Sequence, residues 1–428
     1  MTGAFDAARE ALRWVTDAGV AADGGATWPE SRAPGAPLSD DLYFGTAGVL
    51  VALAEARLSG IADFDDHARA AAARLRSLAC AGSRTGSFAA VAESGCKSGN
   101  PDLGLYTGLS GCMAALRMWA SVSGDSAAGE TARAAMRSIA GIAASGRPVS
   151  ADRDLLSGEA GVLLALIEIG DASVRPAASV IADRLIEEAQ WVEGEPDWYP
   201  RAGATVFTPN FSHGAAGIAY ALAAASTPLE RPDLLEIALL AGRRLVRLGS
   251  RPDGTLAVPH SIPPAGPDSP VAYGWCHGPT GTLRVFQLLD RLRPAQGWAG
   301  HAEACRRAVR TSGLPARLYP GFWDNLGQCC GTAGVGEMAL DRYQETGDTQ
   351  WLAWAVTLAR DVLDRCIADE SGIRWSHTEH RLNPPGLEPR LGWMQGAAGI
   401  ACWLLRLVRV ERDGVSARRI RWPDRSPS

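Results

Sequence analysis

The stretch Gly-Ala-Ala-Gly-Ile-Ala-Tyr-Ala-Leu, residues 214–222, holds two glycines separated by two small residues and then an apolar run. The same Gly-x-x-Gly pattern occurs seven times, each time opening an apolar stretch of helix-forming residues. Its first glycines lie 63, 50, 56, 64, 53 and 65 residues apart, without a gap in the series. Such repetition indicates an architecture built from one repeated unit. The seven motifs begin at Gly45, Gly108, Gly158, Gly214, Gly278, Gly331 and Gly396.

Between the motifs lie seven longer segments in which Arg, Asp and Glu mix with apolar residues at helical spacing. The stretches that follow the glycines are apolar nearly all round, which is typical of buried helices. Together they predict an all-α protein, an α/α toroid in which seven inner helices line a barrel and seven outer helices coat it. The repeat crosses every candidate boundary, so we expect a single domain, residues 1–428. The polar-faced segments are approximately 5–18, 65–79, 125–144, 174–190, 233–249, 301–312 and 351–367.

The paired glycines need a physical reason, because a glycine in a helix costs about 1 kcal/mol relative to alanine. Close approach of the backbone to a neighbouring helix, or to a ligand, would supply that reason. We therefore expect the start of each inner helix to be a crowded place.

Composition and charge bound the possible partners. Hydrophobic residues make up 46% and charged residues 21% of the 428 residues, and the net charge is −5, so nothing indicates a nucleic acid or an anionic membrane as a partner. Residues 1–13 carry acids and no apolar core, and no run of about 18 apolar residues exists, so we expect neither a secretory signal nor a membrane span. An odd number of cysteines, nine, mostly within helical patterns, favours a reducing, cytoplasmic location without disulfides.

Chemistry-bearing residues converge just before the fourth, fifth and sixth motifs. Residues at the same offset before each first glycine should lie at the same height on the ring, so three thiols and two imidazoles are expected at one rim. Helix N-termini favour thiolates. Three soft sulfur ligands suit zinc (Zn2+), with a fourth position open to water or substrate. The residues concerned are Ser212 and His213, Cys276 and His277, and Cys329 and Cys330.

The histidines and one nearby acid suggest proton transfer. His213 stands beside the cysteines on the same rim, where an imidazole can act as a general acid or base. Asp154, four residues before Gly158, could orient His213 or could cap its own helix. The role of His277 stays open among weak ligand, substrate contact and support of a ligand. Three further histidines lie in loop-like segments that the pattern does not place: His260, His377 and His380.

The strings Ser-His-Gly at 212–214, Trp-Cys-His-Gly at 275–278 and Cys-Cys-Gly at 329–331 resemble the signature of the lanthionine synthetase C-like (LanC-like) family. The resemblance implies an α/α toroid with zinc at one end of the barrel. It also implies a lanthipeptide cyclase, which adds peptide cysteine thiolates to dehydroalanine or dehydrobutyrine and forms lanthionine or methyllanthionine. Carried over residue by residue, it implies the following site: zinc ligands Cys276, Cys329 and Cys330, catalytic His213 and Asp154, and His277 and Trp275 close to the substrate.

Two departures from the family pattern stand out. The second ligand motif is usually Cys-His-Gly and is Cys-Cys-Gly here, which makes the metal site more anionic by about one charge and a bound thiolate more nucleophilic. Some members have an arginine four residues before the first ligand, where this chain has Ala272. The seven repeats leave no room for a kinase, lyase or dehydratase region. The resemblance therefore implies that separate enzymes dehydrate a precursor peptide, leader plus core, before this chain acts on it.

Three other functions remain possible on the sequence. Terpene cyclases and some glycosidases use α/α barrels, but they need clustered carboxylates, and the nearest runs, Asp40-Asp41 and Asp65-Asp66, do not share the offsets of the cysteines. A zinc-bearing toroid could bind a peptide or partner enzyme without catalysis. The same site could also add a small thiol such as glutathione to dehydrated residues of other proteins.

Overall fold

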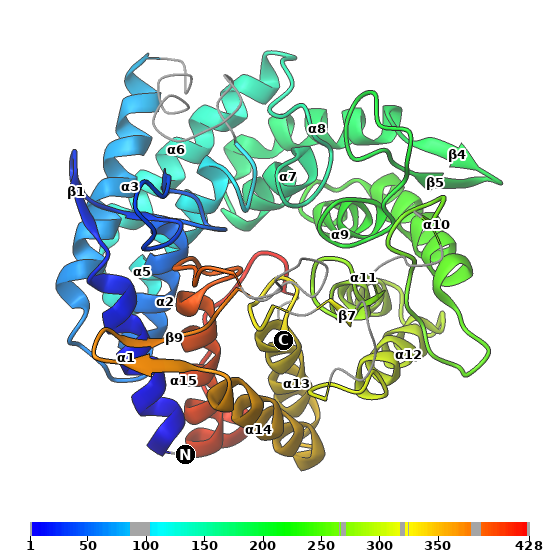
Figure 1. Cartoon of the computed structure of the whole chain (residues 1–428). Coiled ribbons are helices and arrows are strands. Elements are labelled where there is room, and N and C mark those ends of the chain that lie inside the picture. The colour runs from blue at the N-terminus through cyan, green and yellow to red at the C-terminus, as the bar shows by residue number, and fades with distance from the viewer. Residues whose placement is uncertain are drawn as a thin grey trace.

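The computed structural model describes residues 2–85, 103–264, 266, 271–316, 322–323, 325–377 and 387–425. Within these ranges fourteen α-helices alternate between an inner and an outer layer of one ring, as Figure 1 shows. Each inner helix begins directly after the first glycine of a motif, so the predicted α/α toroid is confirmed. The inner helices are α2 (Thr46–Leu58), α5 (Leu109–Ser123), α7 (Glu159–Glu168), α9 (Ala215–Ser226), α11 (Pro279–Leu292), α13 (Thr332–Thr346) and α15 (Ala397–Asp413).

The outer helices bury one face and expose the other, whereas the inner helices are buried over most of their length. In α7, every residue from Glu159 to Leu166 is buried. Among the described residues, no helix is long and apolar enough to cross a membrane. The outer helices are α1 (Thr2–Thr16), α3 (Asp65–Thr85), α6 (Ser126–Ala144), α8 (Arg175–Glu187), α10 (Pro232–Gly249), α12 (Trp298–Arg310) and α14 (Thr349–Asp364), and two short 3-10 helices are η1 (Ala172–Val174) and η2 (Gly414–Ser416).

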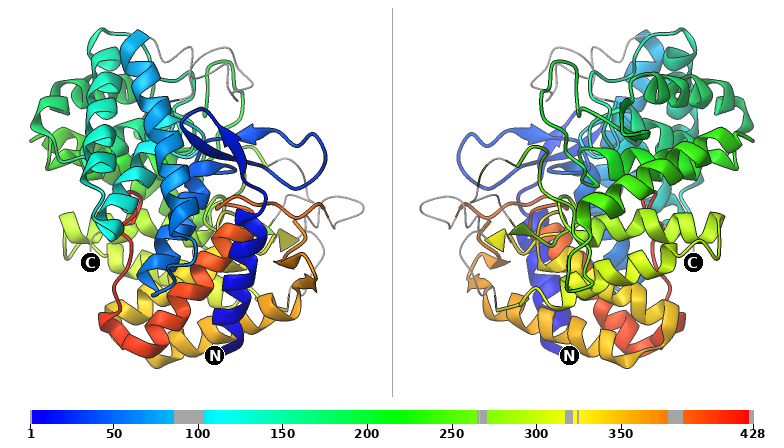
Figure 2. Two further views of the ribbon diagram at one scale, coloured as in Figure 1. Left: turned by 90° about the vertical axis from the view of Figure 1, so that its left-hand side faces the viewer. Right: turned by 90° about the vertical axis from the view of Figure 1, so that its right-hand side faces the viewer.

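Short strands, which the helical repeat did not predict, lie in the connections that lead from an outer helix to the next inner one. They gather on the face where the inner helices begin (Figure 2). Three of the small sheets are antiparallel, and β6 pairs with β7 in parallel. The strands are β1 (Val20–Ala22), β2 (Gly25–Pro29), β3 (Leu38–Ser39), β4 (Gln190–Val192), β5 (Glu195–Asp197), β6 (Val271–Ala272), β7 (Phe322–Trp323), β8 (Ile367–Asp369) and β9 (Gly372–Arg374).

Seven backbone hydrogen bonds form a closed circle at this rim. Each residue that stands two positions before the first glycine of a motif donates its N–H to the carbonyl of the equivalent residue in the next motif. The donor–acceptor distances lie between 2.8 and 3.2 Å. The last residue donates to the first, which joins the two ends of the repeat. In order the members are Tyr43, Tyr106, Leu156, Ser212, Cys276, Cys329 and Met394.

The second glycine of each motif is needed because its surroundings leave no room for a side chain. A Cβ at Gly111 would overlap the carbonyl oxygen of Leu105 and lie 3.1 Å from the Cβ of Leu42 in the preceding repeat. At Gly281 it would overlap the Trp275 carbonyl oxygen in the same way. The crowding that the sequence indicated is therefore with the chain's own preceding turn and the preceding repeat.

The C-terminal segment fills the interior of the ring. After α15 the chain turns back, and the buried carboxylate of Asp424 accepts hydrogen bonds from the hydroxyl of Tyr106 (2.8 Å) and the indole N–H of Trp275 (2.7 Å). Arg284 of α11 forms an ion pair with the same carboxylate at 2.6 Å. The indole of Trp422 packs on that of Trp393, with ring centroids 4.7 Å apart. Figure 1 shows this segment at the centre of the ring.

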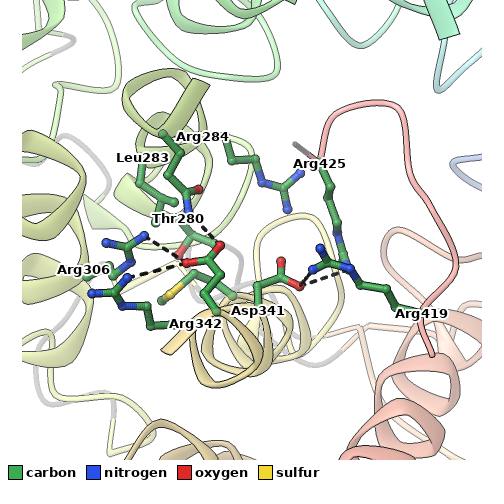
Figure 3. Close-up of a pocket in the computed structure, with 11 residues that line it drawn as sticks. Thr280, Leu283, Arg284, Arg306, Asp341, Arg342, Arg419 and Arg425 are labelled. Atoms are coloured by element: carbon green, nitrogen blue, oxygen red, sulfur yellow. Dashed lines mark hydrogen bonds and ion pairs between the residues drawn. The ribbon is translucent and has the colours of Figure 1, made fainter. Parts of the chain in front are cut away.

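An ion-pair network anchors the C-terminal segment to the inner helices. In Figure 3, Asp341 of α13 faces Arg419 and Arg425 of the segment, at 3.4 and 3.9 Å. It also pairs with Arg406 of α15 at 2.6 Å. Burial raises the pKa of Asp341, but the charges of these three arginines and of Arg284 outweigh burial and hold that pKa below the usual aspartate value. The carboxylate therefore stays charged and keeps the segment in place.

We predict that Gly111→Ala destabilises the fold by about 3 kcal/mol, because the added methyl group overpacks a site bounded by backbone. Urea unfolding of both proteins measures the difference. Gly141→Ala is the matched control, since Gly141 lies exposed in α6 with no atom within 4 Å of an added Cβ. That control should gain up to about 1 kcal/mol from helix propensity. Equal unfolding midpoints for Gly111→Ala and the wild type would contradict this explanation of the motif.

Candidate metal centre

Three thiols from two consecutive motifs lie together beneath the rim. The sulfur of Cys276 is 2.9 Å from that of Cys330, which is 3.4 Å from the sulfur of Cys329. All three side chains are buried, and their sulfur atoms lie within 4.8 Å of one another. In the part of the chain that the structure describes, this is the one group of three or more His, Cys, Asp or Glu side chains with ligand atoms close enough to share a metal ion.

The circle of hydrogen bonds explains why these cysteines meet. The N–H of Cys276 donates to the carbonyl of Cys329 at 3.1 Å, so the two residues are neighbours on the circle although 53 positions separate them in sequence. Cys330 follows directly and turns its sulfur toward that of Cys276. Residues at matched offsets before the glycines are therefore close together in space.

The three thiols shift one another's pKa values. Burial raises the pKa of Cys276 well above its usual range, and hydrogen bonds with Cys276 and Cys329 raise that of Cys330. Burial also acts against ionisation of Cys329, but hydrogen bonds from the two neighbouring thiols outweigh it and lower the pKa of Cys329. The neighbouring sulfur atoms therefore favour ionisation at Cys329, while burial and those neighbours oppose it at Cys276 and Cys330. A buried set of three soft sulfur donors fits Zn2+.

His213 and Asp154 form a hydrogen-bonded pair beside the thiols. The His213 Nδ1 lies 2.7 Å from Asp154 Oδ2. The other carboxylate oxygen accepts hydrogen bonds from the backbone N–H groups of Ser157 (2.8 Å) and Gly158 (2.9 Å), ahead of α7. Asp154 therefore orients the histidine, and its other oxygen holds the turn before α7; it does not cap that helix, whose N-cap residue Gly158 has no side-chain partner. The His213 side chain remains 37% exposed, while that of Asp154 is 3% exposed.

The pair determines the charge of the imidazole. Burial lowers the pKa of His213, but the hydrogen bond to Asp154 and the charge of that carboxylate outweigh burial, so the pKa lies above the ordinary histidine value. The charge of Cys329 acts in the same direction. The carboxylate therefore stabilises the imidazolium form whenever His213 takes up a proton.

Two more imidazoles, those of His277 and His260, lie next to that of His213. The ring of His277 lies 5.6 Å from that of His213 and stacks on His260, with centroids 4.1 Å apart and the planes 8° from parallel. The carbonyl of His260 accepts a hydrogen bond from the side-chain amide of Asn210 at 2.6 Å, which fixes its loop. His277 is thus close to the pair of His213 and Asp154, and its stacking partner comes from a loop that the repeat could not place.

A pocket of about 420 Å³ opens beside the thiols. His213 lies in its wall, and so does Tyr43, whose hydroxyl donates a hydrogen bond to the Cys329 sulfur at 3.1 Å. The pocket therefore reaches His213 directly, and Tyr43 in its wall connects it by one hydrogen bond to the buried sulfur of Cys329. Its lining consists of Tyr43, Phe44, Thr107, Leu156, His213, His377, Leu387, Arg390 and Gln395.

Several pocket residues were not identified from the sequence. Tyr43 and Gln395 stand at the two offsets that also carry the cysteines and His213, so a signal was present, but the periodic pattern groups both with apolar or small rim residues. Arg390 and His377 come from the connection before α15 and carry no periodic signal. His380 lies outside the described residues.

That Trp275 lies close to the substrate stays a prediction of the family resemblance, and its contacts in the structure are with the interior of the ring. Its indole N–H donates to Asp424, its ring packs against Tyr106, and it is not among the residues that line the pocket beside His213. Ala272, where some relatives carry an arginine, belongs to β6. The arginine that lines this pocket is Arg390.

Comparisons with known proteins identify the family of the chain and support its fold. The sequence model of the lanthionine synthetase C-like protein family matches residues 36–417, so the chain belongs to this family. No curated protein matches the sequence. Among solved structures, nisin cyclase superposes with a TM-score of 0.60 and 14% identity, over 86% of this chain and 88% of that one. At this identity the likeness concerns the fold.

Other solved structures are less similar. D-mannose isomerase superposes over 94% of this chain and 97% of its own with a TM-score of 0.47 and 12% identity. An unsaturated glucuronyl hydrolase from Bacillus sp. GL1 has the same TM-score, 16% identity, and coverage of 72% and 87%.

We predict that Asp154→Asn lowers the pKa of His213 from above to below the ordinary value of about 6.5, because burial then acts without the compensating carboxylate. Histidine NMR titration of both proteins in the same metal state measures the shift. His301 of α12 is the internal control, since burial alone lowers its pKa and it should titrate identically in both. An unchanged His213 titration would show that Asp154 does not hold its proton.

Proposed function

We propose that this protein is a zinc-dependent cyclase that forms lanthionine and methyllanthionine rings by adding peptide cysteine thiolates to dehydroalanine or dehydrobutyrine. Membership of the lanthionine synthetase C-like family supports a cyclase-like function. The observation that carries the finer proposal is the placement of a buried three-thiol cluster beside the hydrogen-bonded pair of His213 and Asp154, at the edge of one pocket.

Cys276, Cys329 and Cys330 would hold the zinc ion. The donors are soft, buried and within 4.8 Å of one another, and three protein ligands leave the fourth position open, as in a catalytic zinc site. When bound, zinc lowers the pKa of a substrate thiol so that it reacts as a thiolate near neutral pH. Three protein thiolates make the site more anionic than two thiolates and an imidazole would. A substrate thiolate should then be more nucleophilic, while its pKa is lowered less.

His213 would move the proton. When sulfur bonds to the β-carbon of the dehydro residue, negative charge develops on the α-carbon and its carbonyl oxygen, and the α-carbon must gain a proton. Asp154 holds Nδ1, which leaves Nε2 to exchange a proton with the substrate. His213 can accept the proton that the thiol releases and return it to the α-carbon, so the addition needs no other proton source. Asp154 stabilises the imidazolium between these two steps.

The pocket is suited to a short peptide segment. Its volume of about 420 Å³ is within the range of small-ligand sites, so it can take a few residues of a precursor core at a time. The C-terminal segment fills the ring interior, so we propose that the substrate approaches from the rim that carries the strands. Within the same proposal, the chain acts as one domain in the cytoplasm, on a leader-and-core peptide that a separate dehydratase or kinase/lyase enzyme has dehydrated.

We predict about one zinc per chain in the purified wild type, as expected of a single zinc site, and loss or marked weakening of zinc binding in Cys330→Ala. Elemental analysis under reducing conditions measures this. Cys305→Ala is the matched control, because Cys305 is equally buried but lies in α12, away from the cluster. With zinc retained, His213→Asn should slow cyclisation of a dehydrated, cysteine-containing peptide by about 100-fold or more.

The cyclisation assay separates the alternatives. Mass spectrometry after thiol alkylation counts the cysteines that have not entered rings. A wild type without zinc, even after reconstitution, would leave a peptide-binding toroid as the better account. Wild-type cyclisation by zinc-loaded His213→Asn would exclude the proton-transfer role. Glutathione added in preference to ring closure would indicate the small-thiol reaction.

A further inference from the structure

We propose that Tyr43 is a positioning residue for the metal centre: its hydroxyl donates a hydrogen bond to the Cys329 sulfur, and Gln395 and Arg390 fix the direction of that bond. The inference rests on the proposed function in one respect, namely that the three thiols hold a metal ion. The first and seventh motifs contribute no metal ligand. In this proposal their side chains orient one ligand, the sulfur of Cys329, and tune its charge.

The rim brings these residues together from both ends of the chain. Tyr43 precedes α2 and Cys329 precedes α13, 286 residues later. On the circle of backbone hydrogen bonds only Met394 separates them: Cys329 donates to Met394, and Met394 donates to Tyr43. The phenol thereby reaches across one repeat, and its oxygen lies 3.1 Å from the sulfur. Tyr43 is 8% exposed, so water contributes little to this contact.

Two neighbours determine which way the hydroxyl proton points. The side-chain amide N–H of Gln395 donates to the Tyr43 oxygen at 2.9 Å, so that oxygen acts as an acceptor on one side and its own proton is free for the sulfur. A glutamine amide could be turned round, but the Nη1 of Arg390 donates to its carbonyl oxygen at 2.6 Å and selects one orientation. All three hydrogen bonds therefore run in one direction, from Arg390 in the pocket wall to the thiolate.

A chain of donors that ends on sulfur has a chemical consequence. Hydrogen bonds in series polarise one another, and the cationic guanidinium at the start strengthens the donation at the end. Donation withdraws electron density from Cys329 and offsets part of the negative charge that three thiolates bring to the site. It also holds the sulfur in one rotamer. Partners of this kind orient ligands and tune a bound metal.

Replacement of zinc by Co2+ makes the effect visible, because thiolate-to-cobalt charge-transfer absorption reports the electron density on sulfur. We predict that Tyr43→Phe, which removes only the hydroxyl, shifts this band to longer wavelength. Competition with a chromophoric chelator should show metal affinity weakened about 10-fold. Gln395→Leu should shift the band in the same direction by less, because the hydroxyl then lacks its fixed orientation. Tyr343→Phe in α13, the same chemical change away from the cluster, should leave the spectrum unchanged.

The outcomes are distinguishable. Thermal unfolding of the metal-free variants shows whether each has kept its fold. A folded Tyr43→Phe with the wild-type spectrum and affinity overturns the inference and leaves the proposed function intact. A wild type with no charge-transfer band in Co2+ overturns the metal centre itself, and this inference with it.

Discussion

Seven backbone hydrogen bonds link the starts of the inner helices into a closed circle, and the three cysteines and His213 take their positions from that circle. Buried backbone N–H and C=O groups have to be paired, and here the pairing partner is always the equivalent residue of the next repeat. Cys276 and Cys329 become neighbours for this reason alone. The glycines that follow permit the tight turn that the circle requires, since a side chain at Gly281 would overlap the backbone it must pass.

The circle is built seven-fold, but its chemistry is concentrated on one side. The fifth and sixth motifs supply thiols, and the third and fourth supply the pair of Asp154 and His213. Two of these side chains have a hydrogen-bond partner that fixes their orientation. The imidazole has a carboxylate, and the Cys329 sulfur has the Tyr43 hydroxyl. The proposed cyclisation would need these two capacities side by side, a thiolate held on a metal and a proton held on a nearby base.

The sequence was sufficient to predict the features that recur with the period of the repeat. Helix number, layer and order could be predicted from apolar periodicity, and matched offsets predict that the three cysteines, His213 and His277 share one rim. Residues outside the period could not be placed. Arg390 lies in a connection whose path depends on tertiary contacts, and Trp422 lies beyond the last motif, where only packing inside the ring fixes it. Tyr43 is in register, but its role is not legible in the sequence, because a phenol at a rim position looks like a packing residue until its partner is known.

The most direct test of the account is X-ray absorption at the zinc edge, on the purified protein with and without a dehydrated peptide that carries one free cysteine. The account predicts three sulfur ligands at about 2.3 Å together with one lighter atom, and four sulfur ligands when the peptide is bound. Coordination by nitrogen and oxygen alone, or a sulfur count that the peptide does not change, would contradict a thiol-activating zinc centre at Cys276, Cys329 and Cys330.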